Sequence, residues 1–256
     1  MNSDSVVIIP TYNEKENIRD IINAVLAIAE HQFDVLIVDD NSPDGTGQIV
    51  DSMIAERPDR INILKRAGKM GLGTAYIAGF KWALDHGYEY MIEMDADFSH
   101  PVNKVHELQA ACATGGADVS VGSRYLTGVN VVNWPMGRML MSYYASVYVR
   151  MITGMKVRDA TAGFVCYRRE VLQSFNLDAI EFKGYAFQIE MKFTAHRMGF
   201  NIKEVPIVFV NRVKGTSKMN SSIFFEALWG VIKLRWDSIF NKARFIRQPL
   251  PKQITA

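Results

Sequence analysis

Two carboxylates one residue apart are the first feature of this sequence that could do chemistry. Asp95 and Asp97, with Ala96 between them, end an apolar run, and no Lys or Arg follows closely in the sequence. Paired carboxylates of this kind suit a hard cation such as Mg²⁺ or Mn²⁺, which keeps water ligands and bridges to substrate phosphates. The alternative is structural, because Asp97 or Ser99 could cap a helix whose first residue is Pro101.

The elements that must position this pair follow from the hydrophobic pattern. Strands are predicted at 5–9, 33–40, 60–64, 88–97 and 117–123, and helices at 14–30, 45–56, 71–87 and 102–114. Strands that alternate with helices predict an α/β fold, in which helices cover both faces of a parallel sheet. Asn13 is expected to cap the first helix, in a capping box with Glu16. After residue 125 the pattern predicts longer helices with a few short strands between them.

The loops after the predicted strands carry acids, aromatic residues and a lone arginine. The segments after the first, second, fourth and fifth strands are PTYNE (10–14), DDNSPDGT (39–46), DADFSH (95–100) and GSRY (122–125). The first two, each taken alone, are also compatible with a turn and a helix cap. Ligands of parallel sheets bind beyond the carboxyl ends of the strands, near a reversal of strand order. Together these loops therefore favour a cation site at Asp95 and Asp97.

Composition and missing motifs exclude several classes of protein. The chain has 256 residues, of which 48% are apolar and 22% charged, as is ordinary for a soluble globular protein. Its net charge of +2 argues against a general nucleic-acid binder. The place of a dinucleotide fingerprint, directly after the first strand, holds Tyr12 and Asn13, and the sequence contains no P-loop motif.

The cellular location is also constrained by the sequence. No run of eighteen uncharged apolar residues predicts a membrane span, and no signal peptide is visible. Cys112 and Cys166 lack metal-ligand spacing, which favours buried thiols in a reducing compartment. A cytoplasmic protein is therefore expected.

The order of the motifs resembles that of family 2 glycosyltransferases of the GT-A type, most closely the dolichol-phosphate and other polyprenyl-phosphate mannose synthases. The motifs are PTYNE, VDDNSPDGT, GLGTAYIAGF, EMDADFSHP, GSRY, RDATAGF and GTSK, spread over about residues 5–220. The resemblance implies a Rossmann-like GT-A sheet and inverting transfer of mannose from GDP-mannose to a polyprenyl phosphate, with Mg²⁺ or Mn²⁺. It divides the chain into a catalytic domain, 1–220, and a C-terminal amphipathic helix with a tail, 221–256.

The resemblance also assigns residues to the nucleotide end of the donor. Pro10, Tyr12 and Glu14 resemble the family's guanine and ribose contacts. Val38 and Asp40 resemble the wall beside the base and its hydrogen-bond acceptor, a role that Asp39 could share.

Further positions are assigned to the metal and the phosphates. Asp95, Ala96 and Asp97 match the metal motif, Arg124 matches an arginine near the donor phosphates or sugar, and Arg212 with Lys218 match a basic pair that clamps the pyrophosphate and the acceptor phosphate. Asp97, Arg212 and Lys218 are the expected catalytic residues. Ser99 stands where some relatives have Gln, and Gln188 and Glu190, on a predicted helix at 186–198, match the family without a clear role.

This chemistry explains the residue types. A nucleoside diphosphate leaving group develops negative charge, which a cation and basic side chains stabilise. A phosphate acceptor, with a second pKa of about 6, is mostly dianionic at neutral pH and requires no general base. That agrees with the lack of an obvious catalytic histidine, although His100 lies beside the metal motif. Arg150 and Arg158 could screen the repulsion between the two anions or could lie on the solvated surface.

Other functions remain open at this point. Within the enzyme class, the alternative is transfer of glucose or another sugar from a UDP-sugar to a polyprenyl phosphate or a glycan. A non-catalytic nucleotide-sugar binder would be expected to lose the acidic pair or the basic residues, and both are present. A nucleotidyltransferase would carry a glycine-rich basic loop after the first strand, which PTYNEKEN does not provide.

The C-terminal segment 221–247 suggests how the chain reaches a lipid. Its charged stripe is formed by Glu226, Lys233, Asp237 and Arg244, and its apolar arc by Phe224, Phe225, Leu228, Trp229, Ile232, Trp236, Ile239 and Phe240. Arg235 and Lys242 fall within that arc and could snorkel to lipid headgroups. With a second aromatic helix at 139–152, the pattern predicts peripheral docking on the cytoplasmic leaflet. The alternative is packing on the catalytic sheet or on a membrane-protein partner.

Overall fold

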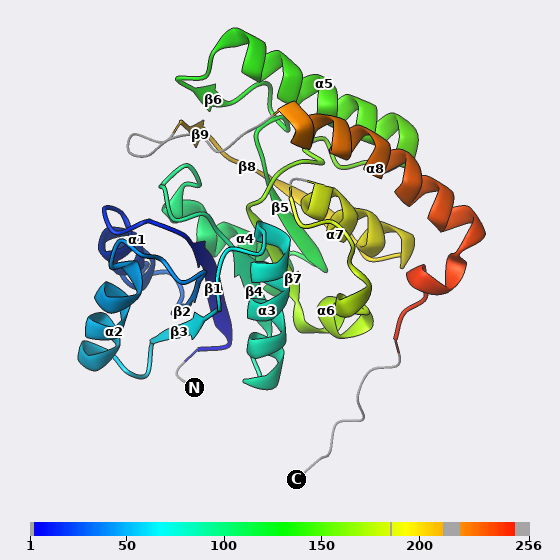
Figure 1. Ribbon diagram of the computed structural model, residues 1–256. Coiled ribbons are helices and arrows are strands. Elements are labelled where there is room, and N and C mark those ends of the chain that lie inside the picture. The colour runs from blue at the N-terminus through cyan, green and yellow to red at the C-terminus, as the bar shows by residue number, and fades with distance from the viewer. Residues whose placement is uncertain (1–2, 185, 212–220, 249–256) are drawn as a thin grey trace.

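The computed structural model describes residues 3–184, 186–211 and 221–248, with the backbone alone at 221–227. Within these ranges a seven-stranded sheet forms the centre of the molecule, in the strand order β3-β2-β1-β4-β7-β5-β8 (Figure 1). The strands are β1 (Ser5–Thr11), β2 (Asp34–Asp39), β3 (Ile61–Lys65), β4 (Tyr90–Glu93), β5 (Val119–Ser123), β7 (Val165–Arg168) and β8 (Ile202–Pro206). β7 runs antiparallel to β4 and β5, and the other neighbours are parallel. The predicted mainly parallel α/β sheet is confirmed.

Both faces of the sheet are buried, as is typical of parallel sheets. Along β1, Val6 and Ile8 face one hydrophobic core, whereas Val7 and Ile9 face the other. The Val6 face is covered by α3 (Leu72–Asp85), α6 (Arg169–Ser174) and α7 (Ala186–Arg197). The Val7 face is covered by α1 (Ile18–Leu26), α2 (Thr46–Glu56) and α4 (Val105–Ala113), and short 3₁₀ turns lie at Val102–Lys104 and Leu177–Ala179.

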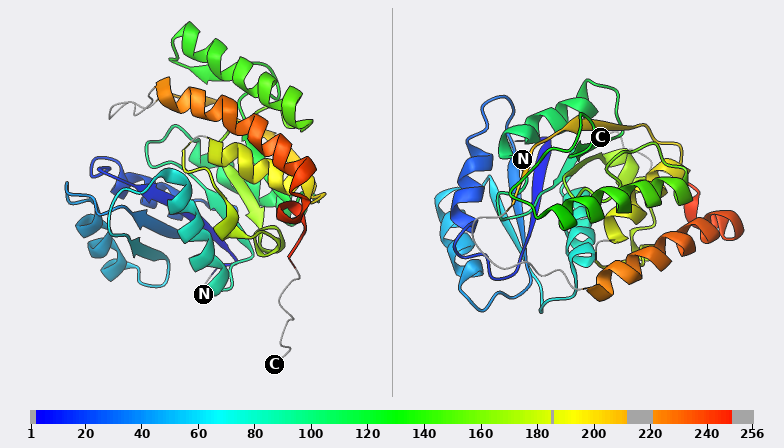
Figure 2. Two further views of the ribbon diagram at one scale, coloured as in Figure 1. Left: turned by 45° about the vertical axis from the view of Figure 1, so that its right-hand side comes forward. Right: turned by 90° about the horizontal axis from the view of Figure 1, so that it is seen from above.

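A third layer lies outside α7. It consists of α5 (Met136–Thr153) and α8 (Ser221–Phe240), which lie side by side in both views of Figure 2. These helices share a separate core with α7 that includes Val149, Phe193 and Leu234. A 3₁₀ turn, Lys242–Phe245, follows α8, and β6 (Val131–Val132) pairs with β9 (Phe209–Val210) as a small parallel ribbon. The division of the chain at residue 220 stays a prediction, because 212–220 lie outside the described residues.

The predicted start of the first helix is wrong. α1 begins at Ile18 rather than at 14, and Asn13 is not its cap. Asn13 adopts a left-handed φ of +59°, and its N–H donates to Ser42 Oγ at 3.0 Å. The segment after β1 therefore crosses to the loop after β2 before the helix starts, which brings the two predicted donor loops together.

The predicted end of the fourth strand is also wrong. β4 ends at Glu93, so Asp95 and Asp97 lie in the loop beyond it. The Asp95 N–H donates to His100 Nδ1 at 3.1 Å instead of to a neighbouring strand, and Phe98 adopts a left-handed φ of +59°. The chain therefore turns back at this point instead of extending the sheet.

Candidate active site

The acidic pair lies where the strand order reverses. β2 and β3 lie on one side of β1, and β4 lies on its other side. The strand order therefore reverses between β1 and β4, and open α/β sheets bind their ligands at such a reversal. Asp97 Oδ1 accepts the Ser99 N–H at 3.0 Å, which fixes the loop locally. The Asp95 side chain is 41% exposed. Asp95 and Asp97 both border one pocket.

His100 supports this loop from behind. Its side chain is 4% exposed, stacks on Phe164 at 5.0 Å between ring centroids and meets the edge of Phe209 at 5.7 Å. Burial lowers its pKa, so the ring is neutral near pH 7, and Nδ1 is occupied as the acceptor of the Asp95 N–H. His100 borders the pocket, but its described contacts fix the position of the acidic pair.

The donor set at the acidic pair fits a hard divalent cation. Within 3–184, 186–211 and 221–248, no three His, Cys, Asp or Glu side chains form a complete metal cage. Two carboxylates at a pocket are the protein ligands expected when Mg²⁺ takes its remaining oxygens from water and a substrate diphosphate. Asp95 and Asp97 would hold such an ion.

A second group of polar residues gathers at the carboxyl ends of β1, β2 and β3. Asp40, 7% exposed, pairs with Arg66 Nη1 at 2.9 Å, and burial raises its pKa against the opposing charge of Arg66. Lys69 Nζ lies 5.0 Å from the centroid of the Tyr12 ring. Arg66 and Lys69 were not predicted, although the segment RAGK directly after the third strand was a signal for them.

The other predicted nucleotide contacts are spread around this group. Asp39 accepts hydrogen bonds from Thr11 Oγ1 at 2.9 Å and from Ser42 Oγ at 2.6 Å, so it ties the end of β1 to the loop after β2. Asp40 therefore remains the better candidate for hydrogen bonding to the nucleobase of the donor. The Val38 side chain is fully buried in the core, which leaves only its backbone for a ligand. Glu14 accepts a hydrogen bond from Asn17 Nδ2 at 3.2 Å. Pro10 is half-buried at the end of β1, and Ala96 is buried beneath the acidic pair.

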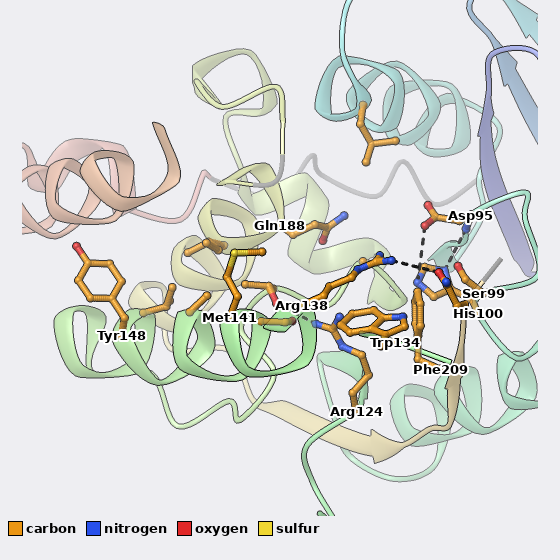
Figure 3. A pocket seen from close by; sticks show the side chains of 18 of the residues that line it. Asp95, Ser99, His100, Arg124, Trp134, Arg138, Met141, Tyr148, Gln188 and Phe209 are labelled. Carbon is orange, nitrogen blue, oxygen red and sulfur yellow. Dashed lines mark hydrogen bonds and ion pairs between the residues drawn. The ribbon is translucent and has the colours of Figure 1, made fainter. Parts of the chain in front are cut away.

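One continuous pocket leads from the acidic pair into the outer helical layer. Figure 3 shows Asp95, Ser99 and His100 at one end and Tyr148 at the other, with Met141 and Gln188 between them. The far part is mainly apolar and is lined by Met141, Ala145, Tyr148, Val149, Ile189, Leu228 and Val231. These residues come from α5, α7 and α8, so the third layer forms the walls of this channel.

Two arginines lie where the polar and apolar parts of the pocket meet. Arg124 is clamped by Asp159 through Nε and Nη2, each at 2.7 Å, and this guanidinium lowers the pKa of Asp159 although burial opposes it. Arg138, on α5, donates to Asn211 Oδ1 at 3.1 Å and lies 4.2 Å from the Trp134 ring centroid. Arg124 was predicted. Arg138 was not, because only the fold brings α5 over the acidic pair.

Two buried ionisable groups lie near the pocket. Glu93, at the end of β4, and Lys192, on α7, are both fully buried. Burial raises the pKa of Glu93 to about 8 against the charge of Lys192, and burial lowers the pKa of Lys192 to about 8 against the charge of Glu93. Lys192 Nζ also donates to the Ala162 carbonyl at 2.6 Å. Lys192 therefore joins α7 to the RDATAGF loop by a hydrogen bond, and its charge acts on Glu93 at the end of β4.

Several predicted basic residues lie elsewhere. Arg150 and Arg158 are exposed and do not line the pocket, and Arg158 Nη1 donates to the Leu126 carbonyl at 2.7 Å. Arg212 and Lys218 fall outside the residues that the structure describes, so their role stays a prediction. Glu190 is buried away from the pocket and accepts the Phe182 N–H at 2.9 Å.

The orientation of α8 is the reverse of that of an ordinary surface helix. Lys233 forms an ion pair with Glu181, and Arg244 pairs with Glu190 and, at 3.2 Å, with Asp237. The exposed side chains are instead apolar: Trp229, Ile232, Trp236, Ile239 and Phe240. Lys233 and Asp237 of the charged stripe therefore form ion pairs that hold α8 in place, whereas the five apolar side chains just named face outward. Leu228, also part of the predicted apolar arc, lines the pocket instead. No described helix is long and apolar enough to cross a membrane.

Several known proteins are similar to this chain in sequence or in fold. The model of the family described as "Glycosyl transferase family 2" matches residues 6–175. The polyprenol monophosphomannose synthase of Mycolicibacterium smegmatis is 45% identical over 89% of this chain and 87% of its own length. The undecaprenyl-phosphate mannosyltransferase of Micrococcus luteus is 45% identical over 91% of this chain and 96% of its own length.

Solved structures agree on the fold at low sequence identity. The glucosyl-3-phosphoglycerate synthase of Mycobacterium tuberculosis, in complex with phosphoglyceric acid, superposes with a TM-score of 0.66 at 14% identity, covering 92% of this chain and 81% of that one. The same enzyme with Mn²⁺, UDP and glucosyl-3-phosphoglycerate gives a TM-score of 0.64 at 16% identity, covering 98% and 82%. At these identities the likeness concerns the fold alone.

Proposed function

We infer the donor and the acceptor from the premise that this chain belongs to glycosyl transferase family 2. The protein is a glycosyltransferase that transfers mannose to a polyprenyl phosphate, and the donor is GDP-mannose. The observation that carries this proposal is the continuity of the pocket. One end is acidic and suits the cation of a nucleotide-sugar diphosphate, and the other is apolar and suits a prenyl chain.

The nucleotide end of the donor would bind along the carboxyl edge of β1, β2 and β3. Tyr12 and Asp40 border this edge, and the described cations Arg66 and Lys69 lie beside them. The diphosphate then reaches Asp95 and Asp97, where bound Mg²⁺ or Mn²⁺ would neutralise the charge that develops on the leaving group. Arg212 and Lys218 stay proposed partners of the same phosphates, by resemblance.

The acceptor would enter from the apolar channel. Its prenyl chain would pack between α5, α7 and α8, and its phosphate would meet Arg138 and Arg124 where the channel becomes polar. Guanidinium groups suit phosphate because they offer parallel N–H donors. Arg124 is held in place by Asp159, so its orientation is fixed before the acceptor arrives. This arrangement screens the repulsion between two anionic substrates.

The chemical step needs no proton acceptor from the protein. A phosphate oxygen of the acceptor forms a bond to the anomeric carbon of mannose, while the bond from that carbon to the β-phosphate oxygen of GDP breaks. Attack from the face opposite the leaving group inverts the anomeric configuration. The acceptor oxygen is already deprotonated at neutral pH. His100, neutral and engaged with the backbone of Asp95, is not required as a base.

The outward apolar face of α8 accounts for access to a lipid. Trp229, Trp236 and Phe240 are 72%, 62% and 67% exposed, and on α5 Tyr144 and Met151 are 63% and 79% exposed. Aromatic residues beside basic residues such as Arg235 and Lys242 suit the interface of a bilayer. The protein is proposed to dock peripherally on the cytoplasmic leaflet through this face. A membrane-protein partner that covers the same face is the alternative.

A transfer assay tests this function. Radiolabelled GDP-mannose or UDP-glucose is incubated with the protein, Mg²⁺ and a polyprenyl phosphate, and the products are extracted into organic solvent. Label from GDP-mannose should enter the organic phase only when the polyprenyl phosphate is present. Label from UDP-glucose alone would replace the proposed donor, and no labelled lipid from either donor would contradict the function.

A further inference from the structure

The pocket contains buried polar atoms for which the described residues provide no hydrogen-bond partner. Within 3–184, 186–211 and 221–248, four of its lining residues carry such atoms: Tyr76 (Oη), Ser99 (Oγ), Trp134 (Nε1) and Gln188 (Nε2). An unsatisfied buried polar group destabilises a folded protein, so several of them around one pocket indicate a ligand with many hydroxyl groups.

Tyr76 and Gln188 are brought together by a close contact between α3 and α7. Gly73 permits that contact, because a Cβ at this position would lie 2.7 Å from the Phe187 ring. Tyr76, one turn further along α3, stacks on the same ring with an interplanar angle of 5°. Gln188 follows Phe187 directly on α7, and Tyr76 and Gln188 both line the pocket.

Both groups lie near the acidic pair. The charges of Asp95, Glu93 and Asp97 add to burial in raising the pKa of the Tyr76 hydroxyl, so this hydroxyl is within electrostatic reach of the acidic pair. Gln188 is 3% exposed and points into the pocket in Figure 3. An amide nitrogen has two N–H donors, so Gln188 can donate one to the buried Glu93 carboxyl group, whose pKa it lowers, and direct the other into the pocket.

Gly163, in the RDATAGF motif, leaves space beside these groups. A Cβ at this position would lie 3.7 Å from Gln188 Nε2 and 3.9 Å from His100 Cε1, which are ordinary contact distances. A bare backbone therefore lines the pocket between Gln188 and His100, with room for an atom the size of a methyl group.

We propose that Tyr76 and Gln188 bind the hydroxyl groups of the transferred hexose, with Gly163 forming the floor beneath the sugar. The inference rests on the proposed function, because a diphosphate bound at Asp95 and Asp97 directs the attached sugar into this part of the pocket. Tyr76 and Gln188 then determine which sugar is accepted. A site that hydrogen-bonds a substrate hydroxyl discriminates strongly against analogues that lack it.

The chain offers matched controls for each residue. Tyr167, like Tyr76, is fully buried with a hydroxyl for which no described residue is a partner, but it does not line the pocket. Thr194 lies on α7 with Gln188, is also 3% exposed with an unpartnered hydroxyl, and does not line the pocket. Tyr167→Phe and Thr194→Val therefore report what the loss of a buried hydroxyl does without touching the sugar.

The test measures the affinity that the sugar adds to the nucleotide. Dissociation constants for GDP and for GDP-mannose are measured by calorimetry with Mg²⁺ and the full-length protein. Tyr76→Phe and Gln188→Met should weaken GDP-mannose binding roughly 10-fold while leaving GDP binding within about 2-fold, since a lost hydrogen-bond partner leaves a sugar hydroxyl unsatisfied. Gly163→Ala should have the same selectivity because its methyl group enters the space of the sugar. Tyr167→Phe and Thr194→Val should change neither constant.

A deoxy analogue separates direct contact from a structural effect. For a GDP-mannose analogue that lacks the contacted hydroxyl, Tyr76→Phe and wild type should bind equally well, and the same holds for Gln188→Met with its own hydroxyl. Equal GDP-mannose affinity in wild type and all three pocket variants would overturn the inference and leave the mannosyltransferase function standing. If wild type binds UDP-glucose instead, the proposed donor is wrong, and the same ratio is measured with UDP-glucose and UDP.

Discussion

The loops at the carboxyl edge of the sheet and the wall formed by α5, α7 and α8 are built in different ways. The loops are held by short polar contacts, such as Asp39 with Ser42 and Asp40 with Arg66. The helical wall is held by apolar packing and by the ion pairs that Lys233 of α8 and Arg244 of the following turn form with Glu181 and Glu190. The first region is therefore fixed for an ionic, polar substrate, and the second presents apolar surface on both its inner and its outer side.

Lys192, on α7, and Glu93, at the end of β4, act on each other electrostatically, and removing Lys192 should give the largest effect on stability. Lys192→Met leaves the buried Ala162 carbonyl without its donor and removes the charge that acts on Glu93, which should lower the free energy of unfolding by about 1–3 kcal/mol. Urea denaturation measures this change. The double variant Glu93→Gln/Lys192→Met should lose less stability than the sum of the two single variants, and additive losses would show that the two groups are not coupled.

At the boundary between the regions, Asp97→Asn should lower kcat by roughly 100- to 1000-fold, because one carboxylate of the cation site is lost. The amide oxygen can still accept the Ser99 N–H, so the unfolding midpoint should stay near that of wild type. Transfer should also stop in excess chelator and return with Mg²⁺ or Mn²⁺. Full turnover in chelator would exclude the cation site.

A pair of variants should separate the two regions by substrate. Arg138→Met should raise the KM for polyprenyl phosphate by roughly 10- to 100-fold, with GDP-mannose affinity unchanged, because a charge-assisted contact to phosphate is lost. Asp40→Asn should instead weaken GDP-mannose binding and leave the KM for polyprenyl phosphate unchanged. Arg150→Met, on the same helix as Arg138 but exposed and outside the pocket, is the matched control. If Arg138→Met weakened the binding of GDP-mannose as much as that of polyprenyl phosphate, the assignment of the two substrates to the two regions would be wrong.

The outer side of the helical wall should show the smallest effect on soluble activity. Trp229→Ser/Trp236→Ser removes two exposed rings and should reduce binding to anionic vesicles in flotation, with transfer to a short-chain acceptor within about 2-fold of wild type. Val129→Ser/Val208→Ser, which changes exposed apolar residues outside α5 and α8, is the control. Wild-type protein that does not float at low salt would favour a protein partner over a bilayer.

The two regions also differ in how far the sequence alone could predict them. The loops after the strands were found because turn residues and acids follow each apolar run, and their meeting at one edge follows from parallel strands. Arg138, Lys192 and the inward charges of α8 were missed, because their partners lie far away in the sequence: Lys192 acts on Glu93, and Lys233 on Glu181. Helical periodicity placed Lys233 and Asp237 on one side of α8, which the structure confirms, but periodicity does not tell which side meets the protein.

The antiparallel strand β7 has a consequence for the order of folding. β7 lies between β4 and β5, both of which precede it in the chain, and it pairs Cys166 with Ile92. During synthesis β1 to β4 can pair as they emerge, but β5 stays separated from them until β7 inserts. Phe164, directly before β7, supplies the ring on which His100 stacks. The loop of the acidic pair therefore gains its support late, and variants at Phe164 should slow refolding of the site more than that of the first four strands.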